Sequence, residues 1–329
     1  MKKMNRKILV TGGAGFIGSH ICEALLSRGD NVAVIDDLST GRLENIETLF
    51  ENARFSFFEN TIMNRGLMDH LVKESDEIFH LAAVVGVKNI VDDPVRTLHT
   101  IIVGTDIVLE LAYKYGNKKV FLASTSEVYG KSPKTPYSED DDRVLGSTTR
   151  SRWSYSSAKA VDEYMALAYN KEHDLPVVIG RLFNTVGPRQ TGQYGMVLPR
   201  FARQALYGEP ITVYGDGTQS RTFCYVHDVV GAVLGLMDHE AARGQIYNIG
   251  TQEEISIMDL AHRVKEITGS SSEIITIPYE EAYGEGFEDM HRRSPDINKI
   301  RNTIGFKPKT RLDEIIKSVA NWVKETGRA

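Results

Sequence analysis

The stretch Lys7-Ile8-Leu9-Val10-Thr11-Gly12-Gly13-Ala14-Gly15-Phe16-Ile17-Gly18 decides the fold. It opens with a short apolar run that is typical of a buried strand, and its glycines at positions 12, 15 and 18 accompany a segment of helical periodicity, Ile17 to Ser27. Such glycines allow a tight turn, a close approach of the backbone to a pyrophosphate, and close packing of helix on strand. The stretch therefore predicts a strand, a turn and a helix that bind a dinucleotide at the helix N-terminus.

Two acidic residues favour NAD as that dinucleotide. Asp36 and Asp37 stand at the end of the second predicted strand, Asn31 to Ile35. A carboxylate there accepts hydrogen bonds from the adenosine ribose hydroxyls and repels a 2′-phosphate. Arg42 is close enough in the sequence to keep NADP as a second reading. A purely structural glycine turn is the weaker alternative, because strand, helix and acidic pair all agree.

Short strand-like runs alternate with helical segments through the first half of the chain. This alternation predicts an α/β protein, a Rossmann-type doubly wound parallel sheet with crossover helices on both faces. After about Asn184 the regularity breaks, which predicts a smaller mixed α/β C-terminal substrate domain. We expect an NAD-binding domain at 1–183, with a return segment at about 226–250, and a nucleotide-sugar-binding domain at 184–329. The other predicted strands are Arg54 to Phe58, Glu77 to His80, Lys118 to Ala123 and Pro176 to Arg181.

Composition excludes several other classes of protein. The chain has 329 residues, 41% hydrophobic and 25% charged, with a net charge of -5, which argues against a nucleic-acid partner. No apolar run reaches the roughly 18 residues of a membrane span. The basic N-terminus does not read as a signal peptide. Cys22 and Cys224 lie in apolar stretches, so we expect two buried thiols and a cytoplasmic location. No metal site is predicted.

A second group of residues has the pattern of a catalytic site. The segment Ser124 to Gly130 follows a predicted strand, at the edge where open parallel sheets bind ligands. Lys159 stands one helical turn after Tyr155, and a lysine beside a phenol lowers the pKa of the phenol, so that Tyr155 can act as a base. A surface tyrosine and lysine on an amphipathic helix give the same pattern by chance.

These motifs together resemble the extended short-chain dehydrogenase/reductase family, in its NAD-dependent nucleotide-sugar epimerase/dehydratase branch. The motifs are closest to those of UDP-glucuronate decarboxylases. The resemblance runs over nearly the whole chain, through Gly12 to Gly18, His80 to Ala83, Ser124 to Gly130, Tyr155 with Lys159, Arg181 to Arg189, Val213 to Gly217 with Arg221, Val226 to Asp228, Tyr247 to Gly250, and Arg293 to Asp296.

The resemblance implies a role for each of these residues. Thr125 and Tyr155 would bind the 4-hydroxyl of the sugar, and Lys159 would hold the nicotinamide ribose. The implied cofactor-binding residues are Gly12, Gly15, Phe16, Ile17, Gly18, Asp36, Asp37, Leu81, Ala82, Ala83, Tyr155 and Lys159. The implied substrate-binding residues are Lys88, Ser126, Asn184, Arg189, Val213, Tyr214, Arg221 and Arg293, and arginines 181, 189, 221, 292 and 293 all fall at or near the expected site.

Glu127 is the residue that bears on the reaction. The branch shares oxidation at C4, after which a 4-epimerase, a 4,6-dehydratase and a decarboxylase diverge. UDP-glucuronate decarboxylases resemble this chain at Thr125 to Glu127 and pair that glutamate with an arginine matching Arg293. We therefore expect decarboxylation of UDP-glucuronate, with Glu127 in proton transfer at C5. His80 to Lys88 resembles glucuronate 4-epimerases instead. A 4-epimerase, and after it a 4,6-dehydratase, therefore stay open as alternatives to the decarboxylase.

Other readings also remain at this stage. The fold alone is compatible with a catalytically silent regulator that binds NAD or a nucleotide sugar, or with a dehydrogenase that releases NADH. Two departures from the family, Thr61 and Ile101, bear on NAD affinity. The segments Ile101 to Tyr115 and Ala160 to Tyr169 are apolar around much of their circumference, and by family resemblance we expect a homodimer with a four-helix interface.

Overall fold

A seven-stranded parallel sheet forms the centre of the protein, in the order β11-β6-β5-β4-β1-β2-β3. The computed structural model describes residues 5–83, 93–192, 196–283 and 290–328. The strand order reverses beside β1, as in a doubly wound sheet, so the predicted fold class is confirmed. The strands are β1 (Lys7–Thr11), β2 (Asn31–Asp36), β3 (Phe55–Glu59), β4 (Glu77–His80), β5 (Lys119–Thr125), β6 (Val177–Leu182) and β11 (Gln245–Ile249).

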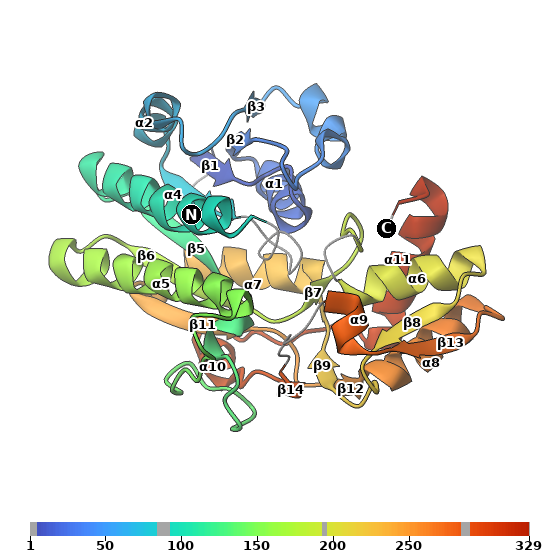
Figure 1. The fold of residues 1–329 in the computed structure, drawn as a ribbon. Helices are drawn as coiled ribbons and strands as arrows, with labels where there is room; N and C mark the ends of the chain where they lie inside the picture. The colour runs from blue at the N-terminus through green and yellow to red at the C-terminus, as the bar shows by residue number, and fades with distance from the viewer. Residues whose placement is uncertain (1–4, 84–92, 193–195, 284–289, 329) are drawn as a thin grey trace.

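Helices cover both faces of this sheet (Figure 1). Alternate residues of a strand point to opposite faces, so Ile8 and Val10 join one core and Leu9 joins the other. The first core is closed by α1 (Phe16–Arg28) and α7 (Val226–Asp238). The second core is closed by α2 (Arg65–Glu74), α4 (Pro94–Lys114) and α5 (Ser154–His173), and α4 and α5 lie side by side (Figure 1).

The six predicted strands lie within two residues of the observed ones at each end. The helix expected over the apolar segment Ile101 to Tyr115 starts earlier than Ile101, so that expected start was wrong. Helix α4 begins at Pro94, where Asp93 is the N-cap and its side chain accepts a hydrogen bond from the Arg96 backbone N–H at 3.2 Å. The two turns before Ile101 are largely polar and partly exposed, so apolar periodicity does not reveal them. An aspartate followed by proline is the local signal that was missed.

A third hydrophobic core, the smaller core, lies outside the large sheet. It is enclosed by α6 (Val197–Tyr207), α8 (Ile257–Thr268) and α11 (Leu312–Thr326). Parallel and antiparallel strand pairs occur here, which fits the mixed α/β character that we expected. The division into domains at residue 183 stays a prediction. The remaining strands are β7 (Thr185–Val186), β8 (Ile211–Tyr214), β9 (Ser220–Thr222), β10 (Cys224–Tyr225), β12 (Glu254–Ser256), β13 (Ile274–Ile277) and β14 (Arg292–Arg293), and the remaining α-helices are α9 (Tyr279–Tyr283) and α10 (Asn298–Ile304).

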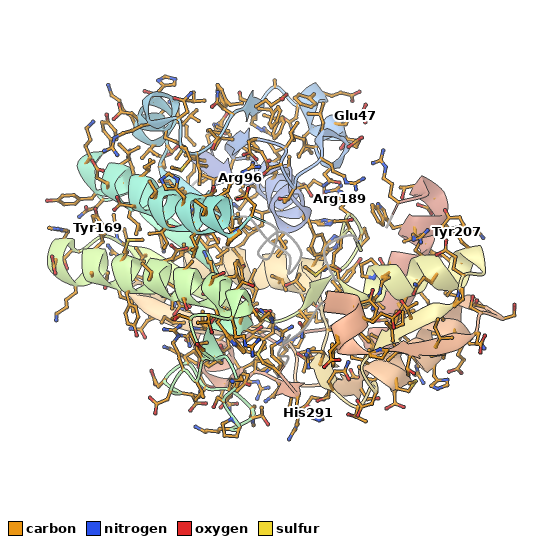
Figure 2. All side chains as sticks on the ribbon, in the orientation of Figure 1. Glu47, Arg96, Tyr169, Arg189, Tyr207 and His291 are labelled. Carbon is orange, nitrogen blue, oxygen red and sulfur yellow. The ribbon has the colours of Figure 1, made fainter. Side chains whose placement is uncertain are left out.

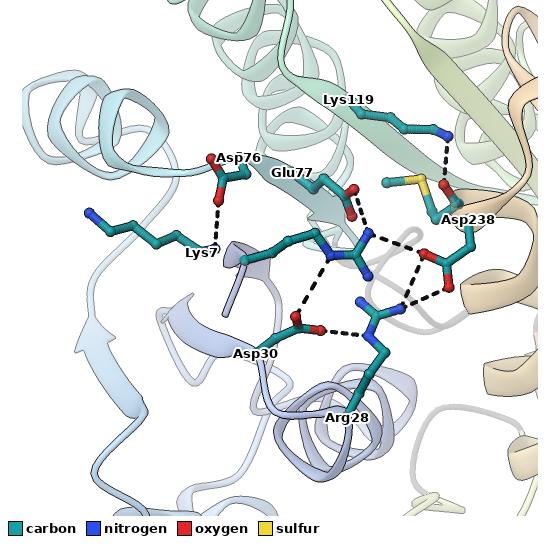
Figure 3. A network of polar contacts seen from close by, with 9 residues as sticks. Lys7, Arg28, Asp30, Asp76, Glu77, Lys119 and Asp238 are labelled. Carbon is teal, nitrogen blue, oxygen red and sulfur yellow. Dashed lines mark hydrogen bonds and ion pairs between the residues drawn. The ribbon is translucent and has the colours of Figure 1, made fainter. Parts of the chain in front are cut away.

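An ion network joins elements at the amino ends of the strands (Figure 3). Nη1 of Arg6 lies 2.8 Å from Glu77 at the start of β4 and 3.1 Å from Asp238 at the end of α7. Arg28, at the end of α1, contacts Asp238 at 3.1 Å and the buried Asp30 at 2.5 Å. The network ties β1 and β4 to the helices of one face, at the opposite edge from the carboxyl ends of the strands.

Both cysteines are buried free thiols, as the sequence predicted. Burial raises the pKa of the Cys22 thiol and of the Cys224 thiol well above the ordinary value, so neither is reactive near neutral pH. The cytoplasmic location stays a prediction. Among the helices of the described residues, none combines the length and the apolar character that a membrane crossing requires.

A buried ion pair joins α5 to the sheet. Nε and Nη2 of Arg181 donate to the two carboxylate oxygens of Glu163 at 3.0 and 2.7 Å, and Ser124 donates to the same carboxylate. Nη1 of Arg181 also donates to the Tyr129 hydroxyl at 2.8 Å. Arg181 therefore serves packing between α5, β5 and β6, and it stands behind the cavity wall, next to the lining residue Leu182.

Replacing Glu163 tests this structural role. Glu163→Gln should lower the free energy of unfolding by about 3 kcal/mol, because removing one partner leaves a buried guanidinium uncompensated. Urea denaturation measures this change, with Glu172→Gln on the exposed face of α5 as the control. Equal stability of the two variants would contradict the assignment.

Candidate active site

A cavity of about 470 Å³ opens at the carboxyl ends of the strands and extends to the smaller core. It brings together residues that are far apart in the sequence, from the glycine loop to β14. The predicted site residues that line it are Gly12, Gly15, Phe16, Ile17, Gly18, Asp36, Asp37, Leu81, Ala82, Ala83, Thr125, Ser126, Glu127, Tyr155, Asn184, Arg189, Tyr214, Arg221 and Arg293.

Two predicted residues lie away from the lining. Lys159 is buried and does not line the cavity. The Val213 side chain lies in the hydrophobic core between α6, α8 and α11. A third predicted residue, Lys88, lies outside the described residues.

The glycine loop leaves room for a phosphate group. A Cβ atom at Gly18 would lie 2.2 Å from the Gly12 carbonyl oxygen, and one at Gly12 would lie 2.7 Å from the Ala82 nitrogen. Helix α1 begins after Gly15 with no side-chain cap and no acidic residue in its first turn. The helix N-terminus therefore keeps its N–H groups and its positive dipole end for an anion, which fits the pyrophosphate of NAD.

Asp36 lies at the end of β2, beside this loop. Its two carboxylate oxygens accept backbone hydrogen bonds from Ala14 and Leu38, both at 2.9 Å, which fixes the side chain against the cavity. A carboxylate retains lone pairs for ribose hydroxyls after these two bonds. Of the two departures from the family, Thr61 lines the cavity, whereas Ile101 is buried and Thr100 lines the cavity in its place.

Thr125 and Tyr155 lie together at the end of β5. A side-chain hydrogen bond joins them, and both line the cavity. Burial raises the pKa of Tyr155, and the negative charges of Glu127 and Asp162 raise it further, while Arg152 and the bond to Thr125 act in the opposite direction.

The expected lowering of the Tyr155 pKa by Lys159 is not found. Nζ of Lys159 donates to the buried Asp162 at 2.7 Å, so that the positive charge is compensated three residues further along α5. The sequence analysis missed Asp162, although an acidic residue at this spacing on a helix was a usable signal.

A chain of polar groups continues from this pair towards β1. Asp162 bonds Thr105, and the Thr105 hydroxyl lies 3.1 Å from Nε2 of His80. Nδ1 of His80 lies 2.7 Å from the Thr11 hydroxyl. Burial, together with the charge of Lys159, lowers the pKa of His80 to about 3, so the ring is neutral near neutral pH. This chain connects Lys159 to the strand that enters the glycine loop.

Glu127 forms the most highly charged contact in the cavity. Arg152 holds both of its oxygens with two hydrogen bonds, one of them 3.0 Å long, and Nη1 of Arg293 donates to Oε1 at 2.9 Å. Arg293 also bonds the side chain of Asn184. We call these four residues the Glu127 cluster. The sequence analysis missed Arg152, although it precedes Tyr155 by three positions and so falls on the same helical face.

The two arginines determine the charge of Glu127. Burial by itself would raise the pKa of Glu127, but the positive charges of Arg152 and Arg293 and their hydrogen bonds lower it to about 2. The carboxylate is therefore ionised near neutral pH, and it cannot donate a proton while both arginines hold it.

Backbone geometry marks two further cavity residues. Asn184 and Arg189 have positive φ angles of 29° and 72°, which are uncommon for residues other than glycine. Such backbone strain concentrates at functional sites. Asn184 is fixed by donating to the Thr222 carbonyl at 2.9 Å, and Arg189 by an ion pair with Glu23 at 2.5 Å.

The far end of the cavity combines an aromatic ring with cationic groups. The Arg200 guanidinium stacks on the Tyr214 ring, 3.7 Å from its centroid, and Arg221 lies in the same part of the lining. Cationic groups of this kind suit a diphosphate. Arg292 was also expected near the site, but it is exposed and pairs with Glu254 at 2.8 Å outside the lining.

This fold and this arrangement of residues define a dinucleotide-dependent enzyme with a Thr125 and Tyr155 centre. The family model described as GDP-mannose 4,6 dehydratase matches residues 9–319. The chain belongs to this family, the NAD-dependent nucleotide-sugar enzymes of the extended short-chain dehydrogenase/reductase group.

Similar proteins include decarboxylases and an epimerase. A UDP-N-acetyl-alpha-D-glucosaminuronate decarboxylase of Bacillus cytotoxicus is 42% identical, covering 98% of this chain and 99% of the relative. UDP-glucuronic acid decarboxylase 1 of Xenopus tropicalis is 36% identical, covering 98% of this chain and 73% of the relative. The solved UDP-glucuronic acid 4-epimerase of Bacillus cereus, in complex with UDP-glucuronic acid and NAD, is 31% identical with a TM-score of 0.86, covering 97% and 99% of the two chains.

The glycine loop gives a direct test of NAD binding. Gly18→Ala should weaken NAD binding at least about tenfold, because the new methyl group meets the Gly12 carbonyl and forces the loop to shift. Calorimetric titration with NAD measures the affinity. Gly231→Ala, on an exposed position of α7 with no atom within 4 Å of the added carbon, is the matched control. Unchanged affinity in Gly18→Ala would refute this placement of the cofactor.

Proposed function

We propose that this chain decarboxylates a UDP-linked hexuronic acid through a 4-keto intermediate, with NAD as cofactor. The observation that carries the proposal is the Glu127 cluster, which places two guanidinium groups beside the Thr125 and Tyr155 pair. Tyr155 would contact the C4 hydroxyl, and the carboxylate of a hexuronic acid is attached only one carbon further along the ring. A cationic group beside the oxidation centre is therefore what such a substrate requires.

The residues of the cavity divide the first step between them. NAD supplies the hydride acceptor for C4 and a positive nicotinamide ring, which would offset the negative charges that raise the pKa of Tyr155. Tyr155 accepts the proton of the C4 hydroxyl, and Thr125 orients that hydroxyl by hydrogen bonding. The role of Lys159 at the nicotinamide ribose stays a prediction, because Lys159 lies behind the cavity wall and donates to Asp162. The product of this step is the 4-ketone of the sugar.

The ketone makes the second step possible. The C6 carboxylate is then that of a β-keto acid, and the electrons of the C5–C6 bond move towards the ketone as CO₂ leaves. The enolate that results takes a proton at C5, which gives a 4-ketopentose; return of the hydride to C4 would give the pentose instead. Glu127 stays a candidate for proton transfer at C5 only when an arginine is drawn away from it, because the two pairings keep it ionised.

The named relatives support decarboxylation. The Bacillus cytotoxicus relative, which matches almost end to end, acts on a 2-acetamido uronic acid by its name, so this sugar is a candidate substrate besides UDP-glucuronate. The similarity to a UDP-glucuronic acid 4-epimerase favours epimerisation as the second candidate function. Both candidates take a sugar with a C6 carboxylate.

Product analysis separates the two functions. We expect the NAD-loaded protein to release CO₂ from UDP-glucuronate or UDP-N-acetylglucosaminuronate, and proton NMR should show a pentose or 4-ketopentose. Tyr155→Phe should slow the reaction by about 10²- to 10⁴-fold, as loss of a general base does. Formation of the C4 epimer without CO₂ would overturn decarboxylation, and net release of NADH without CO₂ would instead indicate a dehydrogenase.

We also propose that the protein pairs with a second copy through α4 and α5. Val161 and Tyr164 of α5 are exposed by 39% and 65%, and Tyr113 of α4 by 44%, although all three are large hydrophobic residues. Tyr113 stacks on His173 at 4.3 Å and packs near Tyr169, which is labelled on the outer end of α5 in Figure 2. An aromatic face on two adjacent helices suits a helical interface.

Sedimentation tests the dimer. The wild-type protein at micromolar concentration should sediment at twice the 36.8 kDa chain mass, and Tyr164→Glu should shift it towards the monomer by placing charges in the interface. Tyr207→Glu is the matched control, because Tyr207 of α6 is 54% exposed and lies on the opposite side of the molecule (Figure 2). A wild-type monomer would contradict the proposal.

A further inference from the structure

The Glu127 carboxylate lies where a substrate carboxylate would be expected. It accepts a two-pronged contact from Arg152 and a third bond from Arg293 at 2.9 Å, in the wall of the cavity. A planar guanidinium binds any carboxylate in this way, whether it belongs to the protein or to a ligand. The contact therefore shows which groups of the protein are shaped for a carboxylate.

Arg152 is placed beside the reacting end of the sugar. It precedes Tyr155 by three positions, in the 3₁₀ turn Ser151–Trp153 that leads into α5, and its charge acts on the Tyr155 hydroxyl together with that of Glu127. In a hexuronic acid, C6 is two bonds from C4. A group that lies beside Tyr155 is thus within reach of the C6 carboxylate when Tyr155 contacts the C4 hydroxyl.

Both arginines of the cluster are shielded from water. The side chains of Arg152 and Arg293 are only 7% and 13% exposed, so solvent screens their charges weakly. A carboxylate that contacts either guanidinium group therefore interacts with a weakly screened positive charge.

We propose that Arg152 is a specificity-determining residue, whose guanidinium group binds the C6 carboxylate of the substrate in competition with Glu127. The inference rests on the proposed decarboxylation of a UDP-hexuronic acid and names the residue that selects it. When the substrate carboxylate takes Arg152, Glu127 loses its two-pronged partner and retains Arg293. A neutral sugar has no group that can displace Glu127, so it gains no contact with Arg152, and the site favours uronic acids over neutral sugars.

Binding measurements on the NAD-loaded protein test Arg152. A Tyr155→Phe background prevents turnover, and calorimetry compares UDP-glucuronate with UDP-glucose. Adding Arg152→Gln should weaken UDP-glucuronate binding at least about tenfold, as loss of a charge-assisted pair does, and leave UDP-glucose binding within about twofold. Arg150→Gln, an exposed residue of the same segment outside the cavity lining, is the matched control.

Glu127→Gln tests the competition without removing an arginine. Since a neutral amide competes poorly for a guanidinium group, this variant should bind UDP-glucuronate at least about threefold more tightly and bind UDP-glucose as before. Unchanged or weaker binding of UDP-glucuronate would overturn the competition. This arm decides the question if Arg152→Gln fails to fold.

The same data separate this inference from the proposed function. If the protein with both arginines intact binds UDP-glucuronate no more tightly than UDP-glucose, the carboxylate selection fails, and support for the proposed function fails with it. If it prefers UDP-glucuronate and Arg152→Gln retains that preference, only the assignment of Arg152 is wrong.

Discussion

The ion pairs of Glu127 with Arg152 and Arg293 hold the catalytic end of the cavity together. They join the 3₁₀ turn Ser126–Tyr129 after β5, the 3₁₀ turn Ser151–Trp153 before α5 and the short strand β14, which are separated by up to 166 residues of sequence. Buried charges are unfavourable unless they are paired, so the segments must meet in this geometry for the cluster to form. The position of Tyr155 follows, because it lies three residues after Arg152, at the start of α5.

The glycine loop imposes the matching constraint at the cofactor end. Gly12 and Gly18 allow the loop, the start of α1 and the residues after β4 to approach more closely than any side chain permits. The Arg6 network fixes the opposite ends of these strands. The residues that line the cavity therefore gather at the carboxyl ends of the strands, between the glycine loop with Asp36 and Asp37 and the arginines of the smaller core's side.

Much of this arrangement could be predicted from the sequence, because local patterns report local structure. The glycine spacing and the strand runs identified the sheet. The motif residues Thr125, Glu127 and Tyr155 all line one cavity. Pairing partners could not all be assigned in the same way. The i, i+3 spacing of Lys159 and Asp162 was a usable signal for their ion pair. A sequence gives no sign that Arg181 turns to Glu163 inside the packing, because that pairing depends on side-chain direction after folding.

The central claim is that the Glu127 cluster recognises the carboxylate of the substrate, and the structure of a complex tests it most directly. A crystal structure of Tyr155→Phe with NAD and UDP-glucuronate should show the C6 carboxylate on the guanidinium group of Arg152, with Glu127 displaced from it. A structure in which Glu127 keeps both contacts to Arg152 while the carboxylate binds elsewhere would contradict the account.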